Sequence, residues 1–427
     1  MRFLHIVLLT SFLTGCSLIP TAAPTQAAEV SITPKPSLVS PTSTPLADSK
    51  NLQKLSIWVP VQFDPNAKSP VTQTLENALQ EFEAKNPGVT VEIRVKAESG
   101  PSGLMETLGL AARAAPDAMP SLVLLTRSQM EAAASKGIIF PYAGFTTVFE
   151  EKDWYPFARE LATFQGDMYG MPLSGDVLAL VSRGNRPSAQ SPTWEDIQKQ
   201  GSSVLFAASD PLAAVPVALY RSAGGKTQDA QLLPLIQPAE LEKTLTLLAT
   251  GAEKNIFPSW LINYSTDEQV MNTFSNQQGG WVITWLSNYL VNQPIDTSVF
   301  PVPSLGTSSA TFASGSVWAL ADTNPERLQL SVKLAEFLSR SEFISKWNLL
   351  NNTLPPRPSA LETWPDPILR PQLNQVALVA EIRPPIDILT ILGPAIQEAT
   401  VQILKKQSDP AKAVQTAIQR LTTPASK

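Results

Sequence analysis

The side chains that most often carry enzyme chemistry are almost absent from this sequence. Its only histidine is His5 and its only cysteine is Cys16. The rest of the chain has neither residue type. It therefore cannot form Ser/His/Asp or Cys/His nucleophile systems, histidine metal sites or cysteine zinc sites. The motifs of phosphate-binding loops, EF-hands and dinucleotide sites are also missing, so we expect no cofactor and no metal. Carboxylates, amides and aromatic rings remain, and these groups bind polar solutes or, as carboxylate pairs, hydrolyse glycosides.

The residues around Cys16 indicate an export signal. A lone cysteine is commonly a small buried hydrophobe, but here Arg2 precedes an apolar run over 3–14 and the small Gly15 stands directly before the thiol, as at a signal cleavage site. The motif LTGC resembles the lipobox of bacterial lipoproteins, which implies cleavage before Cys16 and lipidation of its thiol. We predict a signal peptide at 1–15 and a membrane anchor at Cys16, facing the periplasm or the extracellular side.

The segment after the cysteine is typical of a tether. Residues 16–51 are rich in Pro, Thr and Ala and contain no aromatic residue, so they cannot bury enough apolar surface to fold. A Pro-rich chain extends at most about 3.1 Å per residue, which gives a reach of roughly 90 Å from the membrane. We expect the folded part to begin at Leu52.

Composition limits the class of the folded part. With 32 basic and 37 acidic residues the formal net charge is −5, and no basic patch suggests nucleic acid. After the signal, no apolar run reaches the 20 or so residues that span a bilayer. A length of about 375 residues exceeds what one hydrophobic core usually supports, so two domains are expected.

Alternating strand and helix patterns predict an α/β fold. Residues 54–59 and 89–95 are short strand-like runs, and between them the apolar positions from Val71 to Phe82 repeat on one helical face. A helix at 104–114 and an apolar strand at 121–125 follow. Such alternation implies a parallel sheet, and ligands bind beyond the carboxyl ends of its strands. This places the turn at 60–64 near a site.

A family resemblance covers most of the folded chain. It is carried by these segments: LSIWV and ALQEFEAKNPGVTVEI; MPSLVLLTRSQMEAAASKGIIFPYAGF; YGMPLSGDVLALVSRGN and PTWEDIQKQG; FSNQQGGWVITW; SGSVWALADTNPERLQLSVKLAEFLSRSEFISKW; LPPRPSAL; and DPAKAVQTAIQRL. In this order they resemble the extracellular solute-binding proteins of ABC transporters (family 1, sugar-binding-like). The resemblance implies a two-lobed periplasmic-binding-protein-like α/β fold (type II), in which crossing hinge strands join the lobes and the ligand lies in the cleft between them.

The same resemblance implies lobe boundaries. Lobe I would comprise 52–177 and 305–354, and lobe II 178–304 and 355–427. The first crossing is expected at 176–180, with a return near 300–303 and a further crossing near 354–358.

Seven residues are the main candidates for ligand contact. Asp176 occupies the expected hinge, where the family often offers an acidic group, although it could simply cap a turn. Aromatic faces stack on sugar rings, but large aromatics are more often buried in cores. The predicted set is Asp176, Trp281, Trp285, Trp58, Phe63, Asp64 and Trp318.

Weaker candidates are Trp260, Tyr264 and Arg357, of which Arg357 could instead cap the hinge. Two departures from the family pattern weaken a maltodextrin-like platform. VSRGN at 181–185 replaces the frequent Tyr-Asn, and residues 387–396 contain no aromatic. The ligand is expected to be a small polar solute, with a sugar or sugar derivative as the leading choice.

Three functions stay open. The first is a monomeric, lipid-anchored receptor, not an enzyme, which delivers its solute to ABC permease subunits. The second is a carboxylate-based glycoside hydrolase, for which no paired motif is evident. The third is a solute-binding fold that acts as a sensor or adhesin.

Overall fold

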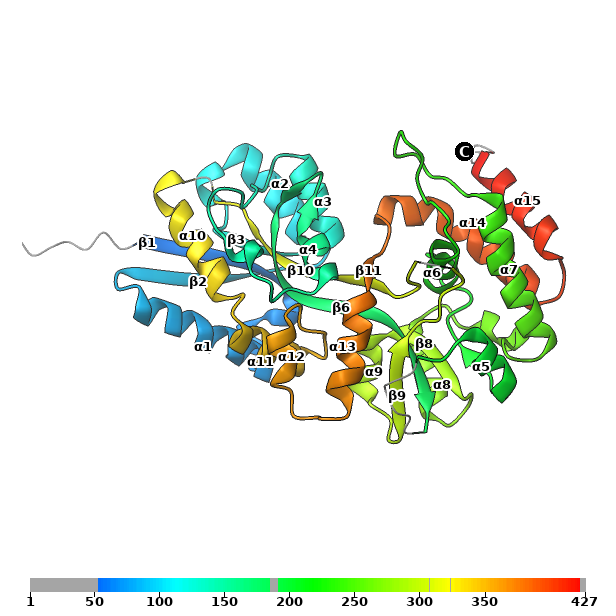
Figure 1. The fold of residues 1–427 in the computed structure, drawn as a ribbon. Coiled ribbons are helices and arrows are strands. Elements are labelled where there is room, and N and C mark those ends of the chain that lie inside the picture. Colours follow the sequence, from blue (N-terminus) through cyan, green and yellow to red (C-terminus); the bar gives the residue numbers. More distant parts are fainter. Residues whose placement is uncertain (1–52, 185–190, 307, 323, 423–427) are drawn as a thin grey trace, which may run out of the picture. The chain divides into compact units, whose positions relative to one another are not determined.

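The computed structural model describes residues 53–184, 191–306, 308–322 and 324–422 (Figure 1). The predicted signal peptide, the tether and Cys16 lie outside these residues. The first elements are β1 (Gln53–Pro60), α1 (Pro70–Lys85), β2 (Val89–Lys96), α2 (Leu104–Ala114), β3 (Leu122–Thr126), α3 (Arg127–Ser135), α4 (Pro156–Ala162), β4 (Thr163–Phe164), β5 (Asp167–Met168) and β6 (Gly170–Arg183).

The middle of the chain contributes α5 (Trp194–Gln200), β7 (Val204–Leu205), α6 (Ala214–Ser222), α7 (Pro238–Glu253), α8 (Asp267–Ser275), β8 (Trp281–Trp285), α9 (Leu286–Asn292) and β9 (Thr297–Pro301). The last part contributes β10 (Phe312–Leu320), α10 (Pro325–Phe337), α11 (Ser341–Asn351), α12 (Pro358–Glu362), α13 (Leu369–Val379), β11 (Glu381–Ile382), α14 (Ile386–Leu404) and α15 (Pro410–Thr422). Short 3-10 helices lie at Val61–Phe63, Pro65–Ala67, Pro116–Ala118, Val148–Glu150 and Ser259–Asn263.

The predicted elements at the start of the chain are confirmed. The hydroxyl of Ser69 accepts a hydrogen bond from the backbone N–H of Thr72 and so caps α1. The apolar stripe of α1 is buried, as its period predicts: Leu75, Leu79 and Phe82 are at most 4% exposed. Strand β1 pairs in parallel with both β2 and β3. This unit therefore follows from local sequence patterns.

The sheet is mixed rather than wholly parallel, which corrects the expectation from the sequence. Strand β10 lies antiparallel between β3 and β6, and the order is β2-β1-β3-β10-β6-β8-β7. β10 comes from about 190 residues after β3 in the chain, so the repeating strand–helix pattern gave no sign of this pairing. The antiparallel central strand is what separates this sheet from a simple doubly wound one.

Strand β6 is long and changes partners in its middle. Its residues up to Val177 pair with β10, whereas those from Leu178 pair with β8 and β9. The change falls inside the segment 176–180, where the sequence suggested a crossing. Because β6 belongs to both halves of the sheet, all of the described residues form one contiguous unit.

Further crossings occur where the chain returns to β6. Gly175 and Leu354 exchange two backbone hydrogen bonds of 2.7 Å. β11 pairs with β10 at Phe312 and Ala313 before the chain continues into α14. In Figure 1, α14 and α15 lie beside α7 and α6.

Residues 355–364 contact elements on both sides of the expected lobe boundary at 354. Helix α12 packs against α11 and α13. The indole N–H of Trp364 donates to the Ser345 carbonyl, Ser359 bonds to Asp153, and Arg370 donates to the Glu362 carbonyl. The boundary implied by the family resemblance stays a prediction.

The core occupies both faces of the sheet. Alternate residues of β1 face opposite ways, so Leu55, Ile57 and Val59 join the cluster beneath α1, while Trp58 joins a second cluster with residues of α2, β3 and α3. In the part of the chain that the structure describes, no helix is long and apolar enough to span a membrane.

Candidate functional site

The first wall of the candidate site is the beginning of α3, which starts where β3 ends. The hydroxyl of Thr126 accepts from the backbone N–H of Gln129, and the Gln129 side chain accepts from the Thr126 N–H, which makes a capping box. Arg127, the first residue of α3, donates from Nε to Oε1 of Glu131, one turn further along the helix, at 2.8 Å. Both side chains are mostly buried. Arg127 also donates to the Glu160 carbonyl of α4. The pair is therefore held in one orientation.

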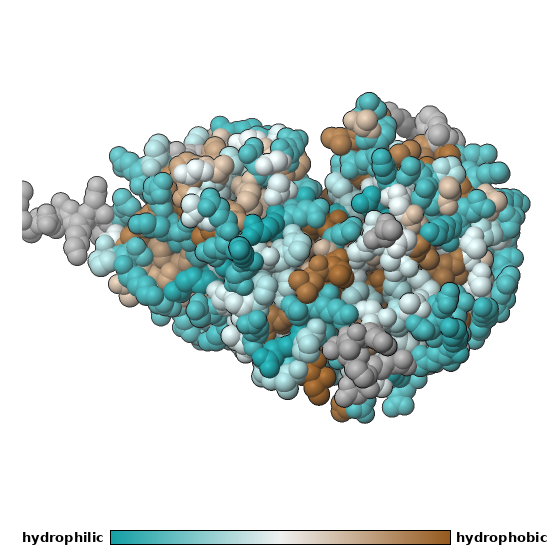
Figure 2. Space-filling model, viewed as in Figure 1, coloured by the Kyte–Doolittle hydropathy of each residue, from teal (hydrophilic) through white to brown (hydrophobic). Residues whose placement is uncertain are grey.

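A cavity of about 530 Å³ opens between α3 and elements from beyond β6. Its wall from the first half of the sheet includes Arg127, Glu131 and Phe164, and its other wall includes Gln228, Leu232 and Ile386. Figure 2 shows a hollow between the part of the surface that carries α2 and α3 and the part that carries α6 and α7, with hydrophilic and hydrophobic residues along its edges. The cavity lies at the carboxyl end of β3, in agreement with the rule for open α/β sheets, rather than at the end of β1.

Asp176 lies on β6, outside the lining of this cavity. Its two carboxylate oxygens accept from the backbone N–H of Ser287 at 3.0 Å and from the Ser287 hydroxyl at 2.6 Å. Burial raises the pKa of Asp176 to about 6, although the bonds from Ser287 and the charge of Arg383 act in the opposite direction. The carboxyl group is thus partly protonated at mildly acidic pH.

Arg383 connects Asp176 with the cavity wall. Its backbone N–H donates to the Ala313 carbonyl at 3.0 Å, and Ala313 pairs with Val177, the neighbour of Asp176. Burial lowers the pKa of Arg383, while the negative charges of Asp176, Asp210 and Glu131 raise it. The guanidinium group therefore faces carboxylates that come from three separate elements.

Two further carboxylates belong to this group. Asp210 caps α6 by accepting from the backbone N–H groups of Leu212 at 3.0 Å and Ala214 at 2.8 Å. Asp267 is the first residue of α8, and burial raises its pKa to about 7, with further increases from the charges of Asp210 and Asp176. We call Asp176, Asp210 and Asp267 the carboxylate cluster. Arg383 is the cation next to it. No group of His, Cys, Asp or Glu among the described residues has the geometry of a metal site.

The two tryptophans of β8 differ in how far they are buried. Both were predicted to contact the ligand, and they lie on one face of the strand, four residues apart. Trp281 is 1% exposed and belongs to the core. Trp285 is half-buried, pairs with Leu178 and lies two residues before Ser287. Of the predicted tryptophans, Trp285 is therefore the one placed next to Asp176 with part of its ring uncovered.

The other predicted aromatics are buried. Trp318 is fully buried in β10, and Trp58 is 2% exposed with the ammonium group of Lys96 4.1 Å from its ring centre. Phe63 packs on Trp347, with ring centres 4.8 Å apart. Asp64 accepts from the backbone N–H of Asn66 and caps a 3-10 helix. These four residues have structural contacts that account for their types.

The weaker candidates divide in the same way. Trp260 and Tyr264 meet edge to face at 5.8 Å, and the Tyr264 carbonyl accepts from Ser209, next to Asp210. The backbone of Tyr264 therefore lies near Asp210 of the carboxylate cluster.

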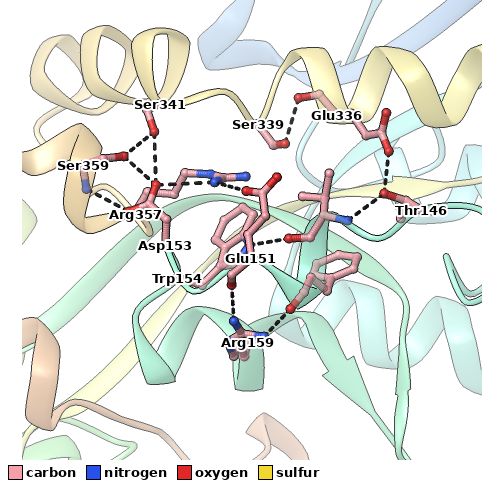
Figure 3. A network of polar contacts seen from close by, with 12 residues as sticks. Thr146, Glu151, Asp153, Trp154, Arg159, Glu336, Ser339, Ser341, Arg357 and Ser359 are labelled. Carbon is pink, nitrogen blue, oxygen red and sulfur yellow. Dashed lines mark hydrogen bonds and ion pairs between the residues drawn. The ribbon is translucent and has the colours of Figure 1, made fainter.

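Arg357 is part of a structural network instead (Figure 3). Its Nη1 lies 2.6 Å from Glu151 Oε2 and 3.5 Å from Asp153 Oδ2, and its guanidinium carbon is 3.8 Å from the ring centre of Trp154. Asp153 also accepts from Ser341 and Ser359. The network fastens the loop before α4 to α11 and α12.

A cavity of about 590 Å³ adjoins this network, but its wall comes from α1, α10, α11 and their neighbouring loops. Two of its charged residues already have partners, since Arg340 pairs with Glu81 and Glu336 bonds to Thr146. It lacks a wall from beyond β6. The cavity beside Arg127 has walls from both sides of β6.

Several site residues were missed by the sequence analysis. Arg127, Glu131, Phe164, Leu232 and Arg383 come from segments that are distant in the chain, and only the capping box after an apolar strand gave a local signal for the first two. Arg383 is positioned by the pairing of β11 with β10, which no local pattern predicts.

Comparisons with known proteins agree with this architecture. Residues 77–371 match the family model of bacterial extracellular solute-binding proteins. The structure is similar to the sugar-binding protein MalE of Xanthomonas citri (17% identity, TM-score 0.68, 86% of this chain and 96% of that one). It is also similar to the maltose-bound maltose-binding protein of Listeria monocytogenes (14%, 0.67, 88% and 100%).

A third similar structure is the cyclic α-maltosyl-1,6-maltose-binding protein of Arthrobacter globiformis (16% identity, TM-score 0.67, 86% of this chain and 97% of that one). At these identities the likeness concerns the fold, which is the two-lobed α/β fold predicted from the sequence. No curated protein sequence matches the chain.

Proposed function

The chain belongs to the family of bacterial extracellular solute-binding proteins, and from this premise we propose that it is a receptor that captures a carbohydrate and delivers it to an ABC permease. The observation that carries the proposal is the cavity between α3 and the segments beyond β6. Its volume of about 530 Å³ falls within the range of small-molecule sites, roughly 300–1,000 Å³.

The lining of the cavity suits a polyhydroxylated solute. Hydroxyl and amide groups come from Ser128, Thr163 and Gln228, while Phe164 and Ile386 offer apolar surface. Sugars present hydroxyl groups at their edges and apolar patches on their ring faces, so a mixed lining binds both. The similar structures named above include proteins that bind maltose and a cyclic maltosyl sugar, which supports the same solute class.

Within this site, we assign Trp285 as an aromatic contact and Asp176 as the central carboxylate. Asp176 already accepts two bonds from Ser287, so its remaining lone pairs are the ones available to solute hydroxyls. The buried candidates Trp58, Trp281 and Trp318 support the sheet beneath.

Membrane attachment and transport are further parts of the proposal. The LTGC motif and the Pro-rich segment at 16–51 support a lipid anchor at Cys16 and a tether long enough for a monomeric receptor to reach its permease. This would place the protein at the cell membrane, on its periplasmic or extracellular side.

Ligand-dependent melting of the full chain tests the proposal. Maltose, maltotetraose, tagatose, single amino acids and oligopeptides would each be added at rising concentration. A carbohydrate that binds should stabilise the folded state by mass action, by about 2.7 kcal/mol at a hundredfold excess over its dissociation constant, and so raise the melting temperature. The bound sugar should be recovered unchanged. Hydrolysis products would favour a glycosidase, and stabilisation by amino acids or peptides alone would contradict the assignment.

A further inference from the structure

The segment from Lys226 to Ile236 forms a rigid arm between α6 and α7, visible as the green loop above α6 in Figure 1. At its base the Tyr220 hydroxyl donates to the Lys226 carbonyl at 2.5 Å and accepts from the Gln237 N–H at 2.9 Å. The N–H of Leu235 donates to the Thr227 carbonyl at 3.0 Å. Tyr220 itself is fully buried, so the base of the arm is fixed in the core.

The tip of the arm is equally ordered. Asp229 Oδ1 accepts from the N–H groups of Gln231 and Leu233, both at 2.9 Å. The Asp229 N–H in turn donates to the Leu233 carbonyl at 2.9 Å, and Gln228 Nε2 donates to the Leu232 carbonyl at 3.1 Å. The tip is thus a closed turn whose shape is set by hydrogen bonds.

This ordered turn holds two leucines in solvent. Leu232 is 68% and Leu233 59% exposed. Leu232 also has φ of 62°, the left-handed region that a bulky side chain rarely adopts. Holding such a residue there costs about 1 kcal/mol or more and yields no burial in this arrangement. A strained and exposed apolar residue on a rigid support indicates a contact that forms in another state.

The cavity shows where that contact lies. Leu232 lines it from one side, while Ala132 and Phe164 line it from the other, and Leu233 is not part of the lining. Closing the cleft would bring the Leu232 side chain onto the apolar surface of Ala132 and Phe164. Because the arm is rigid, it would move together with α6 as a single body.

We propose that the arm 226–236 is a clasp in which Leu232 packs against Ala132 and Phe164 when the cleft closes, so that Leu232 sets how long a solute is retained. The clasp goes beyond the proposed function, since it concerns closure of the cleft and does not depend on which solute is bound. Its contact is apolar and lies at the cavity mouth. It should therefore slow solute release more than it affects the first encounter.

Cross-linking tests the clasp without a ligand. The full chain would carry Leu232→Cys together with Ser135→Cys, since Ser135 is exposed and also lines the cavity. The matched control replaces Leu232→Cys with Leu233→Cys, one residue away on the same turn. With a short bismaleimide, intramolecular cross-linking of the 232–135 pair should be several-fold faster than that of the 233–135 pair. Equal rates, or a faster control, would overturn the clasp.

A second pair of variants keeps the test independent of folding. Leu232→Asn tolerates the left-handed conformation, so the melting temperature of the unliganded chain should not fall, and Leu233→Asn is its control. With whichever carbohydrate raises the melting temperature, Leu232→Asn should increase the dissociation rate several-fold and leave the association rate nearly unchanged. An unchanged dissociation rate would contradict the clasp. If no carbohydrate binds, the proposed function fails while the cross-linking result still decides on the clasp.

Discussion

The Ser287 hydroxyl donates to the Asp176 carboxylate across 2.6 Å, and the Ser287 backbone N–H donates to the other oxygen at 3.0 Å. The two residues are 111 positions apart in the chain. They join the start of α9 to β6, immediately before the point at which β6 exchanges β10 for β8 and β9. The hinge region and the carboxylate cluster are therefore built from the same contacts.

This contact predicts a specific pH dependence of stability. The pKa of Asp176 is raised from 3.8 to about 6 in the folded protein. The folded state therefore holds this proton more tightly than the unfolded state, and the resulting stabilisation is complete below pH 3.8 and is lost as the pH rises through 6. Asp176→Asn should remove this loss, worth about 1–2 kcal/mol after allowance for solvent screening.

Urea unfolding between pH 4 and pH 8 measures the effect. The wild-type profile should fall across this range, and Asp176→Asn should flatten part of the fall. Ser287→Ala should act in the opposite sense, because loss of a donor raises the carboxyl pKa further and destabilises the protein mainly above pH 6. Asp267→Asn is the control. Because the pKa of Asp267 is about 7, this variant should remove a separate part of the loss of stability, at higher pH. Identical profiles for all variants would contradict the assignment.

The tryptophans of β8 should respond to substitution in opposite ways. Trp285→Ala removes a half-buried ring beside Asp176, so we expect weaker carbohydrate binding, by roughly tenfold or more, with a modest loss of stability. Trp281→Ala empties a core position and should cost about 3–5 kcal/mol of unfolding free energy. Calorimetric titration and thermal melting of both variants separate the roles. Unchanged affinity in Trp285→Ala would remove this ring from the site.

Arg357 should matter for stability and not for binding. Arg357→Met removes the cation that pairs with Glu151 and Asp153 and lies over Trp154. Arg357 is buried, but the Glu151 and Asp153 side chains are 48% and 32% exposed, so solvent replaces part of the lost contacts and we expect a loss of about 1–2 kcal/mol. Carbohydrate affinity should stay within twofold, as measured by titration below the melting transition. Arg340→Met, which removes a more exposed pair with Glu81, should cost less than 1 kcal/mol.

Cys16 should decide where the protein resides. Replacing it by serine removes the thiol that the LTGC motif would lipidate, so Cys16→Ser should release the protein from the membrane fraction or leave it unprocessed. Fractionation of cells, with mass spectrometry of the amino terminus, measures both results. Ser17→Ala is the matched control and should stay in the membrane fraction. Membrane retention and acylation of Cys16→Ser would disprove the anchor.

Local patterns predicted the elements around β1, β2 and β3 because each depends on neighbours in the sequence. The apolar stripe of α1 through Leu75, Leu79 and Phe82 is an example. The antiparallel insertion of β10 depends on pairing across the whole chain, and it was not predictable in the same way. The family resemblance, by contrast, correctly implied the two-lobed architecture.

The site was less predictable than the fold. Asp176 was chosen from its place in the expected hinge, and Trp285 as an aromatic ring that could stack on a sugar; the two lie on the neighbouring strands β6 and β8. Trp281 has the same residue type and lies on the same strand, yet it is covered by the core. Arg383 and Leu232 were missed. Their roles depend on the pairing of β11 and on a turn held by Asp229, and neither feature produces a periodic pattern of residues in the sequence.

The central claim is that the cavity beside Arg127 binds a carbohydrate. Calorimetric titration of the full chain with maltotetraose and the other sugars of the panel, in parallel with Arg127→Met, tests it most directly. At least one sugar should bind and be recovered intact, and loss of the Arg127–Glu131 pair from the cavity wall should weaken that binding at least tenfold. Tight sugar binding that Arg127→Met leaves unchanged, or binding of amino acids or peptides in place of sugars, would contradict the account.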